Sequence, residues 1–344
     1  MKSVVVKEFY DTLEQLHVSE VPKPSPKEDE LLIEVIAAGV NFVDTLYARG
    51  KHQNNRSLVL PPFTLGLEFA GVIISAPPSS PHQPGDAVFG DHAGSYTEFL
   101  TLPLSAAASL QKVPRSWSPA DAAGLGATLP VSYGALAIRG SLKAGETVLV
   151  HSAAGGLGIM AVQIGVALGC RVMGTAGSEA KCDYARRFGA NECFDYTKKD
   201  WWKSVFDATD GKGVDVVFDP VGLVDLSLKC IAHRGRILVV GFAGRKSRME
   251  RIAMNRVLLK QVNLIGYRHG ESLRRYPEEK GRLWRELWPL IANGKIKPTV
   301  FQTYEGLESV PQALVDLSSR KVSGKVVIKV TCNQGDVHDL KPRL

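Results

Sequence analysis

A run of small residues between an apolar strand and a helix constrains the fold of this chain more than any other feature. Residues 147–151 read TVLVH, the turn SAAGGLG follows, and IMAVQIGVALG continues with the pattern of an amphipathic helix. Gly155 would let the backbone approach a pyrophosphate closely, and Gly158 would let helix and strand pack together, as in the dinucleotide-binding fingerprint. Ala153 stands where that fingerprint has its first glycine.

The alternation of strand and helix continues beyond this turn. RVMGTAG precedes SEAKCDYARRFG, VDVVFDPVG precedes a helix near Leu226–Ala232, and GRILVVGFAG closes the series. Such βα units build a parallel sheet. A glycine-rich βα turn can form without a ligand, but its place in this series favours a bound dinucleotide. We expect backbone N–H groups at the helix start to hold the pyrophosphate, from Ala154, Gly155, Gly156, Leu157 and Gly158.

The sequence before residue 127 has the pattern of a β domain. VVVKEF, LLIEVIAAGV, FAGVIIS and DAVFG are short apolar runs separated by Pro-, Ser- and Lys-rich turns, which suits a small barrel or sandwich. After the βα region come a charged helical stretch at Pro277–Asn293, a helix near Val310–Ser319 and a last strand, KVVIKV. A length of 344 residues agrees with two domains of this kind.

Charge and cysteine usage restrict the class of protein. The formal net charge is +7, and twelve of the 42 Lys and Arg residues lie within residues 245–285, so the basicity is local. The five cysteines form no CxxC pair, and none precedes Cys170. No apolar run approaches 18 residues, and the N-terminus lacks the features of a signal peptide. We expect a soluble, cytoplasmic protein.

The end of the second βα strand indicates which nucleotide binds. An NAD site normally has Asp or Glu there, about 20 residues after the glycines, to bond the ribose 2′-hydroxyl. This chain has Gly174 and Thr175 followed by Ala-Gly-Ser. The hydroxyl of Ser178 and the ammonium of Lys181 would hold a 2′-phosphate, which favours NADPH. Lys181 could equally be a solvated helix residue, and we expect Glu179 to point outward.

Several longer motifs together resemble a known family. The pattern G-E-x-x-L-x-x-x-A-A-G-G-x-G-x-x-x-x-Q runs from Gly145 to Gln163, and AGVNFVDTL, LGLEFAGV, PGDAV and the closing GKVVI agree as well. Val166 departs from the pattern, because relatives commonly have a basic residue there. Over nearly its whole length the chain resembles the zinc-free quinone oxidoreductase (ζ-crystallin-like) branch of the medium-chain dehydrogenase/reductase superfamily.

The resemblance implies a fold and an assembly. It implies an α/β protein with a GroES-like, partly open β-barrel domain, residues 1–126 with 269–344, and a Rossmann domain of doubly wound parallel sheet, residues 127–268. The active site would lie in the cleft between them. The chain would form a homodimer through the edges of the Rossmann sheets, to which VNLIGY corresponds. We expect neither a membrane span nor a nucleic-acid partner.

Zinc binding can be assessed position by position. Zinc-dependent members of the superfamily have Cys at the position of Asn41 and His at that of Leu67, and they carry a lobe with four cysteines. An amide and an isobutyl side chain cannot replace a thiolate and an imidazole, so no metal is expected. Without a Lewis acid, the easier reaction is hydride transfer from NADPH to a conjugated acceptor such as a quinone or an enone.

The resemblance also assigns roles to single residues. It places Asn41 beside the nicotinamide ribose or the substrate, Gly241, Phe242 and Ala243 against the nicotinamide, Tyr196 with Lys181 at the adenosine end, and Lys325 near the cofactor. Each has an ordinary alternative: turn chemistry for Asn41, strand-end packing for Phe242, and a surface position for Lys325. Asp44 is expected to stabilise a helix start, and core packing is the default for Tyr133.

The proton donor is the least determined part of the site. Tyr47 lies one position beyond the tyrosine of many relatives, and His52 stands where a tyrosine is usual, so either side chain, or water, is a candidate. The function expected is NADPH-dependent reduction of quinones. The alternatives are an enoyl or 2-alkenal C=C reductase and, outside the enzymes, an RNA-binding or crystallin-like structural protein that uses the basic segment.

Overall fold

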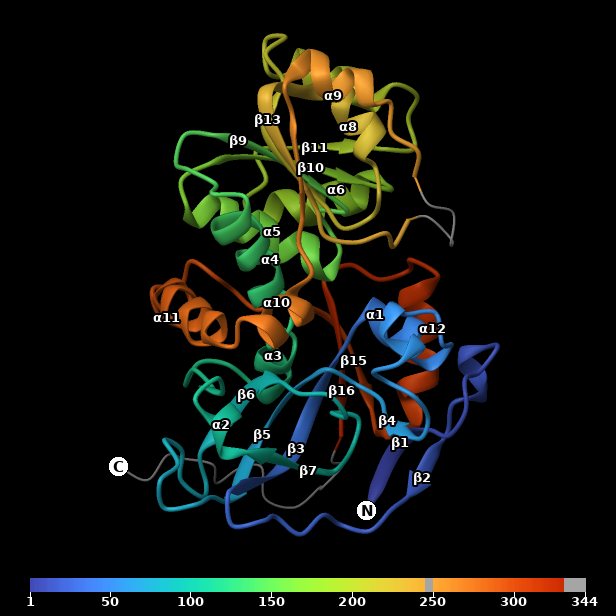
Figure 1. The fold of residues 1–344 in the computed structure, drawn as a ribbon, viewed down its shortest axis with the longest axis vertical. Helices are drawn as coiled ribbons and strands as arrows, with labels where there is room; N and C mark the ends of the chain where they lie inside the picture. The colour runs from blue at the N-terminus through green and yellow to red at the C-terminus, as the bar shows by residue number, and fades with distance from the viewer. Residues whose placement is uncertain (245–249, 331–344) are drawn as a thin grey trace. The chain divides into compact units, whose positions relative to one another are not determined.

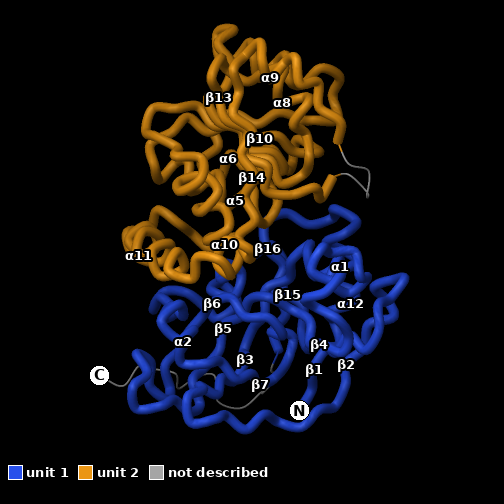
Figure 2. Tube along the Cα trace, in the orientation of Figure 1, with its two compact units in different colours: residues 1–126, 300–344 blue, residues 127–299 orange. Residues whose placement is uncertain are grey.

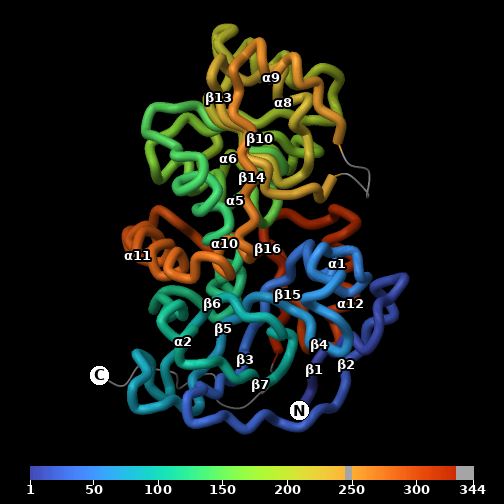
Figure 3. The backbone as a smooth tube through the Cα atoms, in the orientation of Figure 1, coloured from blue at the N-terminus to red at the C-terminus, as the bar shows by residue number. Residues whose placement is uncertain are grey.

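The computed structural model describes residues 1–244 and 250–330, and its chain divides into two compact units (Figure 2). The first unit comprises residues 1–126 and 300–344, and the second comprises residues 127–299. Both ends of the described chain therefore belong to the first unit, as the blue and red segments of Figure 3 show. Three basic residues of the segment noted above (Arg245, Lys246 and Arg248) and the C-terminal tail lie outside the described residues.

The first unit is built on a seven-stranded sheet that contains the last strand of the described residues. The strands lie in the order β15 (Val300–Glu305), β16 (Lys325–Lys329), β3 (Glu30–Val40), β5 (Glu68–Ser75), β6 (Ala87–Asp91) and β8 (Gln111–Lys112), and β7 (Phe99–Pro103) pairs with β3. A smaller sheet has the order β2 (Val18–Glu20), β1 (Lys2–Val6), β4 (Phe63–Thr64). This is the GroES-like domain expected from the sequence.

Strand β3 organises this unit because its sequence is apolar on both faces. Eight of its eleven residues are buried, and β16 and β7 pair with one edge while β5 pairs with the other. Short helices close the unit (Figure 1): α1 (Phe42–Ala48), α2 (Leu104–Ala107), α3 (Pro119–Ala123) and α12 (Val310–Ser318), with the 3₁₀ turns η1 (Leu13–Gln15), η2 (Gln53–Arg56) and η4 (Leu307–Ser309).

The second unit is a doubly wound parallel sheet, as predicted. Its strands lie in the order β11 (Glu192–Asp195), β10 (Arg171–Ala176), β9 (Thr147–His151), β12 (Val214–Asp219), β13 (Ile231–Val239) and β14 (Asn263–Gly266). Every neighbouring pair is parallel. In sequence order this is 3-2-1-4-5-6, the arrangement that binds dinucleotides where the order reverses, between β9 and β12.

Helices of the second unit pack on this sheet and on one another, and one of them differs from its prediction. They are α4 (Thr128–Tyr133), which runs into the π-helix η3 (Gly134–Arg139), α5 (Gly156–Ala167), α6 (Glu179–Arg187), α7 (Trp201–Asp207), α8 (Val224–Cys230), α9 (Met254–Lys260), α10 (His269–Arg275) and α11 (Glu278–Ala292). The amphipathic character predicted for α5 is wrong. Residues 158–165 are all buried, because α4 packs on the face of α5 that the sheet leaves open.

Residues 269–299 group with the second unit, whereas the sequence analysis assigned them to the first domain. Side-chain bonds explain the difference. The amide of Gln163 on α5 pairs with the backbone of Lys297, accepting from its N–H at 2.8 Å and donating to its C=O at 3.2 Å. Tyr133 on α4 donates to Glu286 on α11 at 3.0 Å. The boundary near residue 126 agrees with the expected one.

None of the helices in the described parts of the chain combines the length and the apolar character needed to cross a membrane.

Candidate functional site

The turn after β9 has the geometry of a phosphate-binding turn. Gly155 is the N-cap of α5, and its N–H donates to the carbonyl of Ser152 at 2.8 Å, which closes the turn. Helix and strand approach so closely that a Cβ on Gly158 would lie 2.0 Å from the carbonyl oxygen of Ser152. The first N–H groups of α5 have no intrahelical acceptor, so the helix offers donors and the positive end of its dipole to an anion.

A buried histidine lies beneath this turn and was not predicted. His151 Nδ1 is 2.9 Å from the Thr175 hydroxyl, and Nε2 is 2.8 Å from the Ser227 hydroxyl. Because Ser227 donates its own proton to Leu223, it accepts from Nε2, and Thr175 donates to Nδ1. Burial lowers the pKa of His151, which favours the neutral ring this pattern needs. The Thr175 side chain, predicted to bind cofactor, is thus directed into the core.

The end of β10 carries the residues predicted to recognise the 2′-phosphate. Ser178 is the N-cap of α6, and its hydroxyl accepts from the N–H of Lys181 at 3.4 Å. Glu179 is exposed and pairs with Arg186 at 2.7 Å, so its predicted outward direction is confirmed. Lys181 is half-buried in the first turn of the helix. The residues at this end of the strand therefore include a hydroxyl side chain and a lysine, and the neighbouring acid, Glu179, is paired with Arg186.

Tyr196 covers the same turn. A Cβ placed on Gly177 would lie 2.7 Å from the Tyr196 hydroxyl, so the tyrosine lies against the backbone between Ala176 and Ser178. On β10 itself, a Cβ on Gly174 would meet the Cβ of Ala153 at 2.7 Å. The glycines predicted here are thus needed to bring the two strand ends together.

The loops that follow β12 and β13 are tied together by Asp219. Its carboxylate, which is fully buried, accepts from the N–H groups of Val221, Gly222 and Leu223 at 2.6–2.9 Å. Its carbonyl accepts from Gly241 at 3.3 Å. The next residue, Phe242, is 48% exposed, so it is not packed at the strand end as the alternative supposed. With Ala243, it extends from the carboxyl edge of the sheet, where such folds bind their ligands.

In the first unit, a buried cluster surrounds Asn41. The Asn41 amide donates to Glu68 at 2.8 Å and accepts from the ammonium of Lys325 at 2.9 Å. Lys325 also donates to Glu68 at 2.5 Å and to the carbonyl of Val40 at 2.9 Å. Glu68 is 0% and Lys325 2% exposed, so the surface position considered for Lys325 is wrong. The three ammonium protons each have an acceptor, and the Asn41 amide is held on both sides.

This cluster leaves no space beside strand β3. A Cβ on Gly39 would lie 2.4 Å from the Glu68 carboxylate and 2.6 Å from the carbonyl of Ala123 on α3. Gly39 is therefore required by close approach, because any side chain would displace either the carboxylate or the helix.

Asp44 stabilises the start of α1, as predicted. Its Oδ2 accepts from the backbone N–H of Asn41 at 2.9 Å and from the Tyr96 hydroxyl at 2.6 Å. Both side chains are fully buried, and Oδ1 has no partner among the described residues. Burial, only partly offset by these hydrogen bonds, raises the pKa of Asp44 to about 7. The carboxyl group therefore titrates near neutrality.

Tyr47 and His52, the two candidate proton donors, lie together. Their ring centroids are 4.3 Å apart with the planes inclined at 36°, and the edge of Phe63 faces Tyr47 at 6.5 Å. Asn54 contacts both, through its side chain to Tyr47 at 2.8 Å and through its backbone to His52 at 3.2 Å. The two weakest sequence candidates thus form one cluster, held by a residue that the sequence did not indicate.

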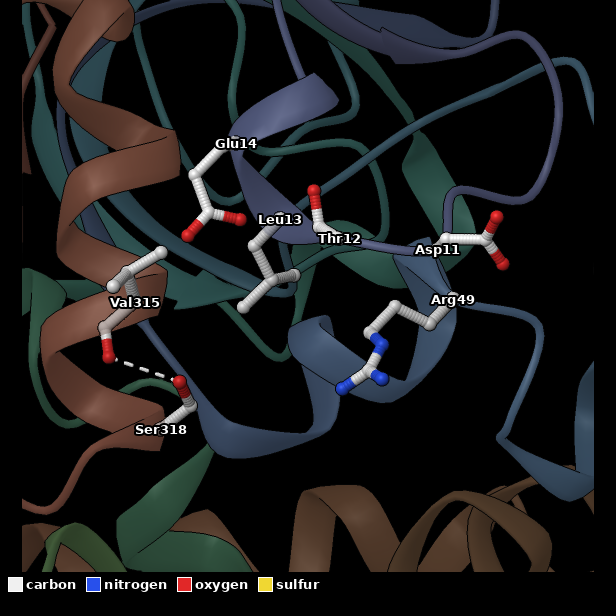
Figure 4. Close-up of a pocket in the computed structure, with 7 residues that line it drawn as sticks. All are labelled: Asp11, Thr12, Leu13, Glu14, Arg49, Val315 and Ser318. Carbon is white, nitrogen blue, oxygen red and sulfur yellow. Dashed lines mark hydrogen bonds between the residues drawn. The ribbon is translucent and has the colours of Figure 1, made fainter.

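A surface hollow and Tyr133 both lie apart from the residues of the candidate site described above. A hollow of about 240 Å³ in the first unit is lined by Arg49, which points into it, and by parts of η1 and α12 (Figure 4). No predicted site residue lines it. Tyr133 is 7% exposed and bonded to Glu286, which agrees with core packing.

Comparison with known proteins identifies the family. Residues 27–112 match the alcohol dehydrogenase GroES-like domain, and residues 156–292 match the zinc-binding dehydrogenase family. Quinone oxidoreductase-like protein 2 of Bos taurus is 32% identical over 325 residues, which cover 92% of this chain and 89% of that protein. The chain belongs to the quinone oxidoreductase branch of the medium-chain dehydrogenase/reductase superfamily. The family resemblance read from the sequence is confirmed.

Solved structures of this superfamily agree with the fold. Escherichia coli quinone oxidoreductase, solved in complex with NADPH, superimposes with a TM-score of 0.83 at 27% identity, covering 96% of this chain and 100% of that one. The CurK enoyl reductase gives a TM-score of 0.85 at 26% identity, covering 96% and 99%. Members of the superfamily therefore share this architecture while acting on different acceptors.

Sequence reasoning missed several residues of the site. Glu68 and Asp219 lie within two motifs quoted above, LGLEFAGV and VDVVFDPVG. An acidic residue inside such an apolar run indicates a carboxylate that is buried and held by hydrogen bonds or an ion pair. His151 gave the same signal at the end of TVLVH. Tyr96 lies in a loop and Asn54 in the short 3₁₀ turn η2, and neither segment has a distinctive pattern, so nothing local indicated these residues.

Proposed function

We propose that this protein is an NADPH-dependent reductase of quinones, in which a hydride passes from the nicotinamide to a conjugated carbonyl acceptor without a metal ion. The observation that carries the proposal is the dinucleotide-binding turn with its close approach at Gly158, in a chain that is about one-third identical to quinone oxidoreductases along nearly its whole length. An enzyme is thus favoured over a structural or RNA-binding protein.

The residues of the second unit fit NADPH. The turn at Gly155 and the start of α5 offer N–H donors to the pyrophosphate, and Tyr196 lies against the backbone at the adenosine end. At the end of β10 a hydroxyl and an ammonium, from Ser178 and Lys181, replace the acid of an NAD site. The relative from Escherichia coli was solved with NADPH. When bound, NADPH would supply the hydride; Phe242 and its neighbours Gly241 and Ala243 would border the nicotinamide.

The residues of the first unit would orient the acceptor and supply a proton. Asn41 is fixed by Glu68 and Lys325, so its amide is preorganised rather than recruited on binding. We assign Lys325 to the positioning of Asn41 instead of to direct contact with the cofactor, because its ammonium protons already have acceptors. The oxygen of the reduced acceptor would take its proton from the Tyr47–His52 pair.

The independence from zinc is part of the proposal. Asn41 and Leu67 stand at positions that hold a thiolate and an imidazole in zinc-dependent relatives, and neither can ligate zinc in that way. Asn41 is instead engaged with a carboxylate and an ammonium.

Turnover with defined acceptors tests the function. The purified protein is expected to oxidise NADPH in the presence of 9,10-phenanthrenequinone or 1,4-benzoquinone, with no loss of rate after treatment with 1,10-phenanthroline. A 2-alkenal is assayed in parallel, because the likeness to the CurK enoyl reductase favours C=C reduction as the second candidate. Identification of the product separates the two reactions. Failure with all three acceptors would refute both.

The choice of NADPH is tested by removing one ammonium. Lys181→Ala should raise the KM for NADPH roughly tenfold and leave that for NADH unchanged, because only NADPH carries the 2′-phosphate. Arg187→Ala is the matched control, since it removes a positive charge from the exposed end of the same helix. Equal effects of the two variants on both cofactors would contradict the assignment of Lys181.

We also propose that the enzyme is a homodimer joined at the edge of the Rossmann sheet. Within the described chain, β14 is an edge strand that pairs only with β13. Helix α9 directly precedes it and exposes Met254, Leu258 and Leu259, which are 62%, 76% and 73% accessible. An unpaired strand edge beside an apolar helix face is suited to a second copy of the same element.

A further inference from the structure

Tyr47, His52 and Asn54 form a compact group at the end of helix α1. Tyr47 lies in the last turn of α1, His52 is the N-cap of η2, and Asn54 is the second residue of that 3₁₀ turn. The loop between them is closed by a hydrogen bond of 2.9 Å from the N–H of Lys51 to the carbonyl of Leu46. Main-chain geometry therefore sets how the three side chains face one another.

Asn54 determines the direction of the Tyr47 proton. Its amide Nδ2 donates to the Tyr47 oxygen at 2.8 Å. Since the oxygen accepts this bond, the phenolic proton is directed to a different acceptor. The same bond strengthens when the oxygen becomes negative, because a hydrogen bond to a charged acceptor is about twice as strong as one to a neutral acceptor. Asn54 thus favours loss of the proton from Tyr47.

The backbone of Asn54 determines the state of His52. Its N–H points to His52 Nδ1 at 3.2 Å, so this nitrogen must carry a lone pair. A histidine cation has protons on both nitrogens and cannot accept this bond, so the contact favours the neutral ring with its proton on Nε2. A neutral imidazole is a far weaker acid than a phenol, which leaves Tyr47 as the better donor of the pair.

We propose that Asn54 is a positioning residue that makes Tyr47 the proton donor of the reaction. The inference rests on the proposed function. In the step concerned, the acceptor gains a hydride and its electron pair from NADPH, and the negative oxygen that develops takes the proton from Tyr47. The resulting phenolate is stabilised by the Nδ2–H group of Asn54 and is reprotonated by water, so that one NADPH and one proton are consumed per acceptor.

Substitutions of Asn54 separate this role from a structural one. Asn54→Ala removes the donor and should lower kcat roughly tenfold to hundredfold, with the KM for NADPH unchanged. Asn54→Asp should lower kcat further, to the level of Tyr47→Phe, because a carboxylate attracts the Tyr47 proton and repels the phenolate. The alkaline limb of the kcat–pH profile should move to higher pH in Asn54→Ala and be absent in Tyr47→Phe.

Gln53→Ala provides the matched control, since Gln53 is an exposed neighbour in the same turn. It should retain wild-type kcat. In the Tyr47→Phe background, Asn54→Ala should have no further effect on kcat. The proposal is overturned if Asn54→Ala behaves like Gln53→Ala, if Asn54→Asp is faster than Asn54→Ala, or if the two losses are additive.

A readout that does not depend on turnover distinguishes failure of this proposal from failure of the proposed function. In protein with ¹⁵N-labelled histidine, the ring of His52 should show the Nε2–H tautomer at neutral pH. A cation or an Nδ1–H tautomer would overturn the positioning by Asn54 even if quinones are reduced. Conversely, an enzyme inactive with every acceptor would refute the function, while the tautomer would still test the geometry.

Discussion

At the scale of residues, the site of the first unit depends on one buried ion pair. Glu68 and Lys325 are almost completely inaccessible, and both contact Asn41. A buried pair contributes little net stability compared with apolar side chains, but removal of one partner leaves an uncompensated charge. The pair therefore fixes the Asn41 amide, but substitution of either Glu68 or Lys325 is expected to destabilise the protein.

This dependence predicts non-additive effects on stability. Glu68→Gln and Lys325→Met should each destabilise the protein by about 3–5 kcal/mol, because each leaves its partner charged and buried. The double variant should be more stable than the sum of the single effects predicts, since it removes both charges. Denaturant unfolding of the four proteins measures this coupling, and strictly additive losses would contradict it.

The buried carboxyl group of Asp44 should make the free energy of unfolding depend on pH. Its pKa is raised from the ordinary value of 3.8 to about 7, mainly by burial, so the folded protein keeps a proton that the unfolded chain releases. The stabilisation is fully present below pH 4 and is lost as the pH rises through about 7. The wild-type unfolding free energy, measured relative to that of Asp44→Asn, should fall by about 2–3 kcal/mol from pH 5 to pH 8.

Asp44→Asn is the appropriate reference because its amide oxygen can still accept from Asn41 and Tyr96 but does not titrate. Other carboxylates contribute equally to both proteins and cancel in the difference. A difference that is flat between pH 5 and pH 8 would show that Asp44 does not titrate in this range.

At the scale of elements, α9 and β14 predict the oligomeric state. Leu258→Glu combined with Leu259→Glu should convert the proposed homodimer into a monomer, because two charges would be placed in the apolar face beside the strand edge. Light scattering coupled to size exclusion gives the mass directly. Met254 lies on the same helix, and a conservative Met254→Leu change should leave the dimer intact. A wild-type monomer would contradict the proposed interface.

The elements also show how far the sequence could be read. Strands β9, β10, β12 and β13 were predictable because local apolar runs and glycine turns mark their βα units. The short strand β11 was not predicted, since its four residues, ECFD, form no apolar run. The burial of α5 on all sides could not be predicted, because it depends on the packing of α4 against α5, which the sequence of α5 alone does not indicate. The contact of Glu68 with Lys325 joins residues 257 positions apart, and no local periodicity encodes such a pairing.

At the scale of the whole molecule, several arginines of the basic segment, within residues 250–285, are paired with carboxylates. Glu271 alone pairs with Arg268, Arg274 and Arg275, and hydrogen bonds from Arg274 and Arg275 lower the pKa of its carboxyl group to about 2. Arg256 and Arg282 pair with Asp225 and Glu286. Arginines engaged with carboxylates neutralise fewer phosphates, so fewer of the counterions condensed on an RNA would be released on binding. The distribution of charge therefore disfavours the RNA-binding alternative.

Filter binding over a salt series tests this conclusion. Affinity for single-stranded RNA should be weak and should change little with salt concentration, because few phosphates would be engaged. If the logarithm of the binding constant instead falls with the logarithm of the salt concentration with a slope of about −4 or steeper, the surface binds several phosphates. That result would restore the RNA-binding alternative.

The position of β16 in the sheet has a consequence for the synthesis of the protein. This strand lies between β3 and β15, yet it is translated 295 residues after β3 begins (325 − 30), and it carries Lys325. On the ribosome, the second unit can emerge and fold while the first is still without its last strand. Until residues 325–329 arrive, Glu68 lacks its counter-charge and one edge of β3 is open. A chain that stops before this point therefore cannot complete the cluster that holds Asn41.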